Sequence, residues 1–235
     1  MKILAVDSSS QTSAVALCED ERLISSFMQN NGNTHSQTLL PMIEQMLKIN
    51  GTDIEDIDIF ALSCGPGSFT GVRIGAATVK GLAFGKNKPC VAVSTLQVLA
   101  ENLKGFHGII CPVMNARRSQ LYNALFMSDG ENIKRLCNDR LIVESELACE
   151  LSQYNEKIYF CGDGYNIAKK ACASLLTENT PEQLRYPSGY SVASYALRAY
   201  KNGDYTDDKK LVPSYLRASQ AERELKEKIN NEVKK

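Results

Sequence analysis

The order in which apolar segments change their period constrains the fold of this 235-residue chain more than any other feature. Residues 3–28 contain three short stretches with strand character, separated by brief polar turns, and these predict an antiparallel meander. Behind Thr34, apolar residues recur at helical spacing as far as Asn50-Gly51. The other elements expected in this half are strands at 57–63 and 89–94 and helices at 70–84 and 95–103.

After Gly105 the same order of elements begins again. The expected elements are strands at 109–113, 120–127 and 133–143, a helix at 145–154, a strand at 157–161 and a helix at 167–176. The repeat predicts an α/β fold of two lobes, each built on a βββαβα unit. We expect a first lobe at 1–104 joined by a helix near 191–204, a second lobe at 105–190, and a C-terminal extension at 205–235 with a charged helix from Gln220.

Composition excludes several classes of protein. The chain has 27 basic and 27 acidic residues, and a formal net charge of zero argues against autonomous nucleic-acid binding. The first apolar run ends at Asp7, far short of the roughly 18 apolar residues of a membrane-spanning helix, and no signal-peptide pattern opens the chain. We therefore expect a cytoplasmic protein without membrane contact. The eight cysteines show no CxxC spacing, which predicts eight separate buried thiols.

A glycine-rich turn, GPGSFTGVRIG at 65–75, lies between a predicted strand and a predicted helix. Such a position can present backbone N–H groups to an anion. The turn lacks the Gly-Lys-Ser/Thr of a P-loop, the third glycine of a dinucleotide fingerprint and the paired glycines of a nucleophile elbow, so a tight strand-to-helix turn is favoured. Gly71, Gly75 and Thr78 leave one side of the helix nearly bare, which predicts a close backbone from this chain or from a partner.

Five segments together resemble the TsaB/YeaZ family, the small bacterial subunit of the tRNA threonylcarbamoyladenosine machinery. They are ILAVDSS at 3–9, THSQTLLP at 34–41, the glycine-rich turn at 65–75, VMNARR at 113–118 and PSYLR at 213–217. They occur in the order of the family. The chain departs from the family at Asn115, where an acidic residue is usual, and this puts a charge-dependent role of that position in doubt.

The resemblance implies the fold shared by actin, sugar kinases and heat-shock chaperone ATPases (the ASKHA fold), in agreement with the repeat. It also implies a non-catalytic relative of the transferase TsaD. The two would pair and, with the ATPase TsaE, serve threonylcarbamoylation of the adenosine beside the anticodon in tRNAs that read A-starting codons. On this interpretation the chain has no cofactor of its own, and ATP and a metal ion belong to the partner subunits. The chain would meet tRNA only through the complex.

The inventory of reactive residues agrees with a non-catalytic subunit. The catalytic relative holds a metal with an H-x-x-x-H pair, whereas His35 and His107 lie far apart and lack a second ligand at metal spacing, so neither a metal site nor a catalytic residue is expected. Asp7 and Ser9 are the candidates for cofactor binding, in a turn without the glycine that lets a phosphate come close. The alternative is that Asp7 caps its own turn.

Two smaller features also carry predictions. The spacing of Thr34 and Gln37 predicts a capping box, with His35 as a polar residue at the helix start. The pair Arg117-Arg118 lies beside a predicted strand, where it either meets a phosphate or a partner carboxylate or is simply solvated.

We expect the helices at 34–49 and 70–84 to pack against the equivalent helices of TsaD in a pseudo-twofold arrangement. The reason is an apolar stripe combined with a glycine-smoothed face. The residues expected at this interface are Thr34, His35, Leu39, Leu40, Ile43, Met46, Thr70, Gly71, Ile74, Gly75 and Thr78. The same patch favours a twofold homodimer when the chain is alone.

Two other functions belong to different classes. A small ATP-dependent phosphotransferase of the same superfamily would need a second phosphate loop and an acidic catalytic residue in the second half. Its only candidate is Cys161-Gly162-Asp163-Gly164, which is more simply a strand-to-helix turn. A peptidase is least favoured, because the sequence shows neither a nucleophile–base pair nor a metal pair.

Overall fold

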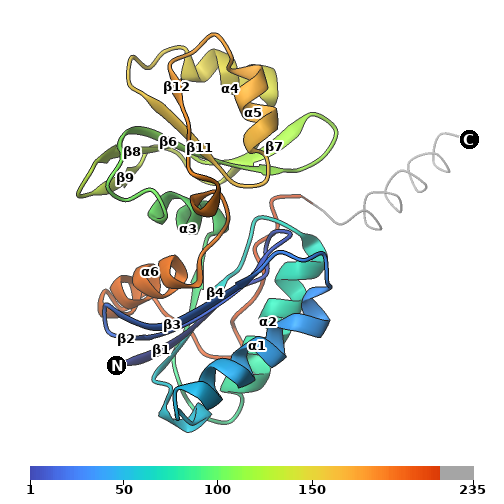
Figure 1. The fold of residues 1–235 in the computed structure, drawn as a ribbon, viewed down its shortest axis with the longest axis vertical. Helices are drawn as coiled ribbons and strands as arrows, with labels where there is room; N and C mark the ends of the chain where they lie inside the picture. Colours follow the sequence, from blue (N-terminus) through green and yellow to red (C-terminus); the bar gives the residue numbers. More distant parts are fainter. Residues whose placement is uncertain (218–235) are drawn as a thin grey trace, which may run out of the picture.

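The structure, a computed structural model, describes residues 1–217 and consists of two lobes, each with its own sheet (Figure 1). The charged helix expected from Gln220 lies outside the described residues. In residues 1–217, every helix is too short or too polar to cross a membrane. The lobe limits at 104, 190 and 205 stay predictions.

The first sheet has the strand order β3-β2-β1-β4-β5. Its strands are β1 (Lys2–Asp7), β2 (Ser13–Glu19), β3 (Arg22–Gln29), β4 (Ile59–Ser63) and β5 (Cys90–Val93). The first three are antiparallel, as the tight turns predicted, whereas β4 and β5 run parallel to β1 and follow it through helical connections. The carboxyl ends of β1 and β4 therefore lie side by side.

Alternation along β1 divides this sheet into two buried faces. Leu4 and Val6 pack with α1 (His35–Ile49) and α2 (Phe69–Ala83). Ile3 and Ala5 pack instead with α6 (Gly189–Lys201). Helices thus cover both sides of the sheet, as Figure 1 shows, and every residue of β4 is buried.

The second sheet repeats the order as β10-β7-β6-β11-β12, with β8 and β9 added beside β6. Its strands are β6 (His107–Asn115), β7 (Gln120–Asn123), β8 (Phe126–Asp129), β9 (Ile133–Arg135), β10 (Arg140–Val143), β11 (Ile158–Cys161) and β12 (Thr177–Glu178). The helices α4 (Glu144–Leu151) and α5 (Tyr165–Ala171) pack on one face, and short 3-10 turns occupy Ile54–Asp56 and Glu182–Leu184. The shared order confirms the predicted α/β fold with two βββαβα lobes.

Two predicted strands of the second lobe are wrong in their extent. The segments 120–127 and 133–143 each form two strands, because β7 pairs with the end of β6 while β8 pairs with its beginning. Pro112 lies in β6 between these two stretches and has no N–H for a ladder bond. The side chain of Asn123 donates from Nδ2 to Pro112 O over 3.1 Å at this break.

The helix α3 (Thr95–Glu101) follows the first sheet in the chain but packs with the core of the second, through Leu96 and Leu99. The helix α6 follows the second sheet and packs on the first. Asn102 links the two helices, since it donates from Nδ2 to Tyr186 O over 2.6 Å and accepts from Ser191 Oγ over 2.7 Å. The last helix of each lobe in the chain order therefore packs with the core of the other lobe.

The expectation of eight buried thiols holds for six cysteines and is wrong for two. All eight are free thiols; Cys137 is partly buried and Cys149 is exposed at the surface of α4. Burial raises the pKa of Cys18 and of Cys64 to about 11, which keeps these thiols protonated at neutral pH.

Candidate functional site at the junction of five segments

Four of the five segments that carry the family resemblance meet at the carboxyl ends of β1 and β4, and the fifth, at the end of β6, is joined to them through Arg217. Four hydrogen bonds link them or residues next to them: Ser8 Oγ to Gly71 O (2.9 Å), His35 Nε2 with Ser10 O (2.9 Å), Ser214 N to Cys64 O (2.8 Å) and Arg217 Nη1 to Ala116 O (2.7 Å). Residues up to about 200 positions apart in the sequence thus form one continuous site.

Asp7 lies at the centre of this site and is fully buried. Its Oδ1 accepts from Ser9 N over 3.1 Å, and its Oδ2 accepts from Ser9 Oγ over 2.8 Å. Burial raises the pKa of the Asp7 carboxyl above its ordinary value, although the hydrogen bonds act in the opposite direction. Asp7 therefore caps its own turn, and the two candidates for cofactor binding are hydrogen-bonded to each other.

The glycine-rich turn covers the Ser8-Ser9 turn directly. Ser68 N donates to Ser9 O over 2.7 Å. A Cβ atom at Gly67 would collide with Ser9 O, and one at Gly71 would collide with Ser8 O. The turn is thus a strand-to-helix connection, and its glycines allow close contact within the chain.

The residues expected at a partner interface fall into two groups. Leu39, Ile43, Met46, Gly71 and Gly75 are buried, and the remaining six are exposed or partly exposed: Thr34, His35, Leu40, Thr70, Ile74 and Thr78. A Cβ atom at Gly75 would collide with Ser8 Oγ of the same chain. The glycine-smoothed face of α2 therefore meets its own chain, and the pairing of these helices with a partner stays a prediction. The outward faces of α1 and α2 stay accessible.

The start of α1 differs from the predicted capping box. The Oγ1 of Thr34 donates to Gln37 Oε1 over 2.9 Å and makes no cap bond to the backbone. The cause is a competing turn, in which Gln37 N donates to the backbone oxygen of Thr34 over 3.0 Å. The prediction of a reciprocal box is wrong.

His35 points toward β2, and its Nδ1 lies 2.8 Å from Ser13 Oγ. The sequence analysis missed this pair, because the two residues are on different elements and share no motif spacing. Ser13 is only 3% exposed, and its hydroxyl is also 3.1 Å from Thr38 Oγ1. A substrate has no access to this hydroxyl, so the pair serves to dock α1 on β2.

A segment that we call the strap, residues 206–217, runs along the first lobe and ends between the lobes (Figure 1). The ring centroids of Tyr215 and Phe69 are 4.9 Å apart. Arg73 donates from Nε to Tyr215 Oη over 2.8 Å, and its guanidinium lies 3.8 Å from the centre of the Phe69 ring. The sequence contained both segments but no signal that they touch.

The second lobe repeats the geometry of the Asp7 turn. Asn115 ends β6, and its Oδ1 accepts from Arg117 N over 2.8 Å. Asn115 N donates to Asp163 Oδ1 over 2.8 Å, and Gly164 N donates to Val113 O over 3.1 Å. The turn at 162–164 thus packs on β6 as the glycine-rich turn packs on β1, and an amide is sufficient to close the turn.

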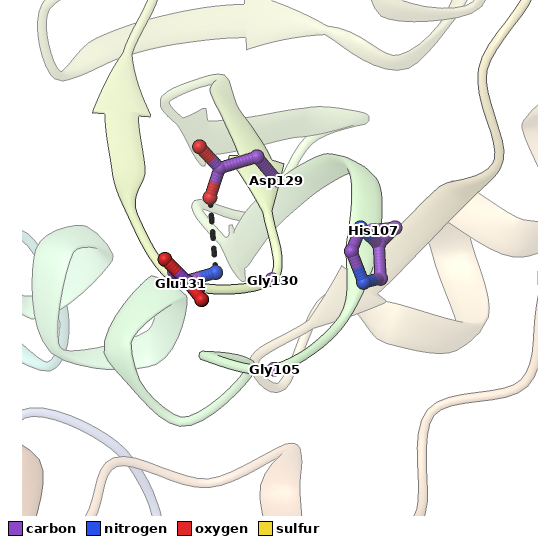
Figure 2. A pocket seen from close by; sticks show the side chains of 5 residues that line it. All are labelled: Gly105, His107, Asp129, Gly130 and Glu131. Carbon is purple, nitrogen blue, oxygen red and sulfur yellow. Dashed lines mark hydrogen bonds between the residues drawn. The ribbon is translucent and has the colours of Figure 1, made fainter.

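Figure 2 shows a separate surface pocket in the second lobe, lined by Gly105, His107, Asp129, Gly130 and Glu131. The Oδ1 of Asp129 accepts from Glu131 N over 2.9 Å, so this carboxylate closes its own turn. Within residues 1–217, no three His, Cys, Asp or Glu side chains are placed to hold a metal ion. His107 thus lies apart from the five-segment site.

Comparison with known proteins gives consistent matches. The family model described as TsaD, tRNA N6-adenosine threonylcarbamoyltransferase, matches residues 29–225. The tRNA threonylcarbamoyladenosine biosynthesis protein TsaB of Bacillus subtilis is 29% identical over 223 residues, which is 94% of this chain and 96% of that protein. TsaB of Escherichia coli is 34% identical over 155 residues, which is 65% of this chain and 67% of that protein.

Two solved structures from Pseudomonas aeruginosa have the same fold. One, described as similar to peptidase YeaZ, has a TM-score of 0.80, and the other, YeaZ, has a TM-score of 0.76. Each is 26% identical, and each alignment covers 92% of this chain and 99% of the other. With its two βββαβα lobes and the five joined segments, the chain belongs to the TsaB/YeaZ family, within the group that the TsaD model describes.

Proposed function

We propose that this chain is a non-catalytic subunit of tRNA threonylcarbamoyladenosine biosynthesis in the cytoplasm, and that it pairs with a TsaD-family transferase. One observation carries the proposal: the chain's own glycine-rich turn packs directly on Ser8 and Ser9, in the turn that Asp7 closes. The site has the backbone arrangement of the fold, but the polar groups of Asp7, Ser9 and Ser68 form hydrogen bonds with one another.

The residues present do not fit a nucleotide phosphate at this turn. A phosphate would need free backbone N–H groups at this turn, and Ser9 N already donates to Asp7 Oδ1 over 3.1 Å. Asp7 is fully buried and accepts two hydrogen bonds from Ser9, so it has no access to a solvated cation. ATP and the metal ion of the pathway would accordingly be bound by the partner subunits, TsaD and the ATPase TsaE.

The outward faces of α1 and α2 are the proposed pairing surface. Leu40 on α1 is 52% exposed, and Ala77 and Phe84 are exposed along and just after α2. A tRNA N6-adenosine threonylcarbamoyltransferase of Kosmotoga olearia is 33% identical over 157 residues, which is 60% of this chain and 48% of that protein. Related chains present related helix pairs, and this favours a pseudo-twofold contact. The isolated chain would use the same surface for a homodimer.

The test is co-purification of the tagged chain with the TsaD of its own organism. Leu40→Asp and Ala77→Arg place charges on the proposed surface and should abolish pairing while the melting temperature stays unchanged. Leu176→Asp is the matched control, because Leu176 is 58% exposed on the second lobe. Pairing that survives both surface variants would show that the interface lies elsewhere.

Calorimetry addresses the proposed lack of nucleotide chemistry. The isolated chain, titrated with ATP and Mg²⁺, should show no binding and no turnover. Tight binding with turnover would favour a phosphotransferase and would overturn the non-catalytic assignment.

A further inference from the structure

The loop between β6 and β7 holds three consecutive residues in the left-handed backbone conformation. Arg117, Arg118 and Ser119 have φ values of 63°, 54° and 56°. None of them is Gly or Asn, so each carries a conformational cost. Such residues persist only where the surroundings fix them, and they concentrate at functional sites.

Contacts from three sides fix this loop. Arg117 N donates to Asn115 Oδ1, and Arg117 O accepts from Gln120 N over 3.1 Å. Ser119 O accepts from the first residue of α4 over 3.3 Å, and Arg217 of the strap donates to Ala116 O. The left-handed run is therefore tied by hydrogen bonds to the start of α4 and to the strap.

The loop contains hydrogen-bond donors that have no acceptor in the described part of the chain. Among residues 1–217, the backbone N–H groups of Arg118 and Ser119 have no backbone acceptor, and the side chains of Arg117 and Arg118 are exposed. Successive N–H groups in turns with left-handed residues form concave receptors for anions, and paired guanidiniums match phosphate geometry. The carboxylate that contacts the loop, Asp163, already accepts from Asn115 N.

We propose that residues 117–119 bind a backbone phosphate of tRNA. The inference rests on the proposed function, and it assigns this subunit a direct contact with the RNA. Two guanidiniums and two N–H groups would hold one phosphate through charge-assisted hydrogen bonds. One local contact is also compatible with a net charge of zero, because most of the affinity would come from the rest of the assembly.

The test uses the full ¹⁵N-labelled chain in its complex with TsaD, titrated at low salt with an unmodified tRNA transcript and separately with inorganic pyrophosphate. The amide signals of Arg118 and Ser119 should shift with both probes. Arg117→Gln/Arg118→Gln should abolish these shifts, lower the tRNA affinity of the complex with TsaD about tenfold, and reduce the slope of log K against log salt by about 1. The control Lys104→Gln/Lys134→Gln removes the same charge from exposed positions elsewhere and should keep the amide shifts and the affinity.

A second variant separates binding from folding. Arg118→Gly suits the left-handed conformation, so its melting temperature should not fall, while its phosphate-induced shift weakens. Unchanged tRNA affinity in the double variant would overturn the proposal, and a shift with pyrophosphate but not with tRNA would overturn the RNA assignment. Pairing with TsaD is measured on the same samples, because loss of pairing in the unsubstituted chain would instead refute the proposed function.

Discussion

Asp7 and Asn115 occupy equivalent ends of β1 and β6 and close equivalent turns, yet only one of them carries a carboxylate. Each accepts the N–H two residues ahead, over 3.1 Å at Asp7 and 2.8 Å at Asn115. Burial raises the pKa of Asp7, so the charged form at neutral pH costs folding free energy that an amide would not cost.

Asp7→Asn should therefore not destabilise the protein at pH 7. A carboxyl whose folded pKa is raised binds more protons in the folded state, so its contribution to stability falls as pH rises from its unfolded pKa of about 3.9 through the folded value. The variant should gain stability relative to the parent over this window, and Ser9 Oγ can reverse its role toward the new amide. Urea unfolding between pH 4 and 8 measures the difference.

Asp129→Asn should change the stability of the protein in the opposite direction from Asp7→Asn. The backbone N–H groups of Asn132 and Glu131 hold the pKa of the Asp129 carboxyl below its ordinary value. A lowered folded pKa stabilises the protein above the unfolded pKa, and this contribution is lost as pH falls through the folded value. The variant should thus be less stable than the parent at pH 7 and approach it in acid. The same trend in both variants would contradict burial as the cause at Asp7.

At the scale of one element, α2 contains glycines in two different environments, one tightly packed and one open to solvent. A methyl group at Gly71 would collide with the backbone oxygen of Ser8, whereas nothing lies within 4 Å of a methyl group at Gly81. Gly71→Ala should cost about 2–3 kcal/mol or more through overpacking, and Gly81→Ala should add about 0.5–1 kcal/mol through helix propensity. Thermal unfolding of both variants decides whether α2 docks on the Ser8 turn. Equal effects would place that contact elsewhere.

The sequence predicted most elements of the first lobe within about two residues, because period-2 and helical patterns there end at clear turns. The second lobe was less predictable. On one edge of β6 the partner strand changes at Pro112, because the residues before it pair with β8 and those after it pair with β7. The hydrophobic pattern of one strand does not show which neighbouring strand it pairs with, or at which residue the pairing passes from one neighbour to another.

The candidate site could be predicted only in part. The small residues on one side of α2 correctly predicted that another backbone segment packs closely against it. Their spacing cannot show whether that segment is Ser8 of the same chain or belongs to a partner. The contact of His35 with Ser13 was missed for a similar reason, because it joins two elements across the sheet face. The stacking of Tyr215 on Phe69 depends on the path of the whole strap.

At the scale of the whole molecule, two sets of contacts hold the lobes together. In the first, α3 packs with the core of the second lobe and α6 packs with the core of the first. The second is made by the strap, which contacts Phe69 and Arg73 in the first lobe and Ala116 in the second. Because the strap ends at the loop that carries Arg117, it ties the proposed pairing helix α2 to the proposed phosphate loop.

Tyr215→Ala should loosen both ends of this connection. Loss of the stacked ring and of the bond to Arg73 should cost about 1–2 kcal/mol, which for a chain of this size lowers the melting temperature by a few degrees. Amide hydrogen exchange should rise at residues 64–73 and also at 115–117, since Arg217 loses its anchor. Tyr215→Phe keeps the ring and loses only the hydroxyl, so it should show a smaller effect at the same amides. Faster exchange confined to 213–217 would mean that the strap lies on the lobes without holding them.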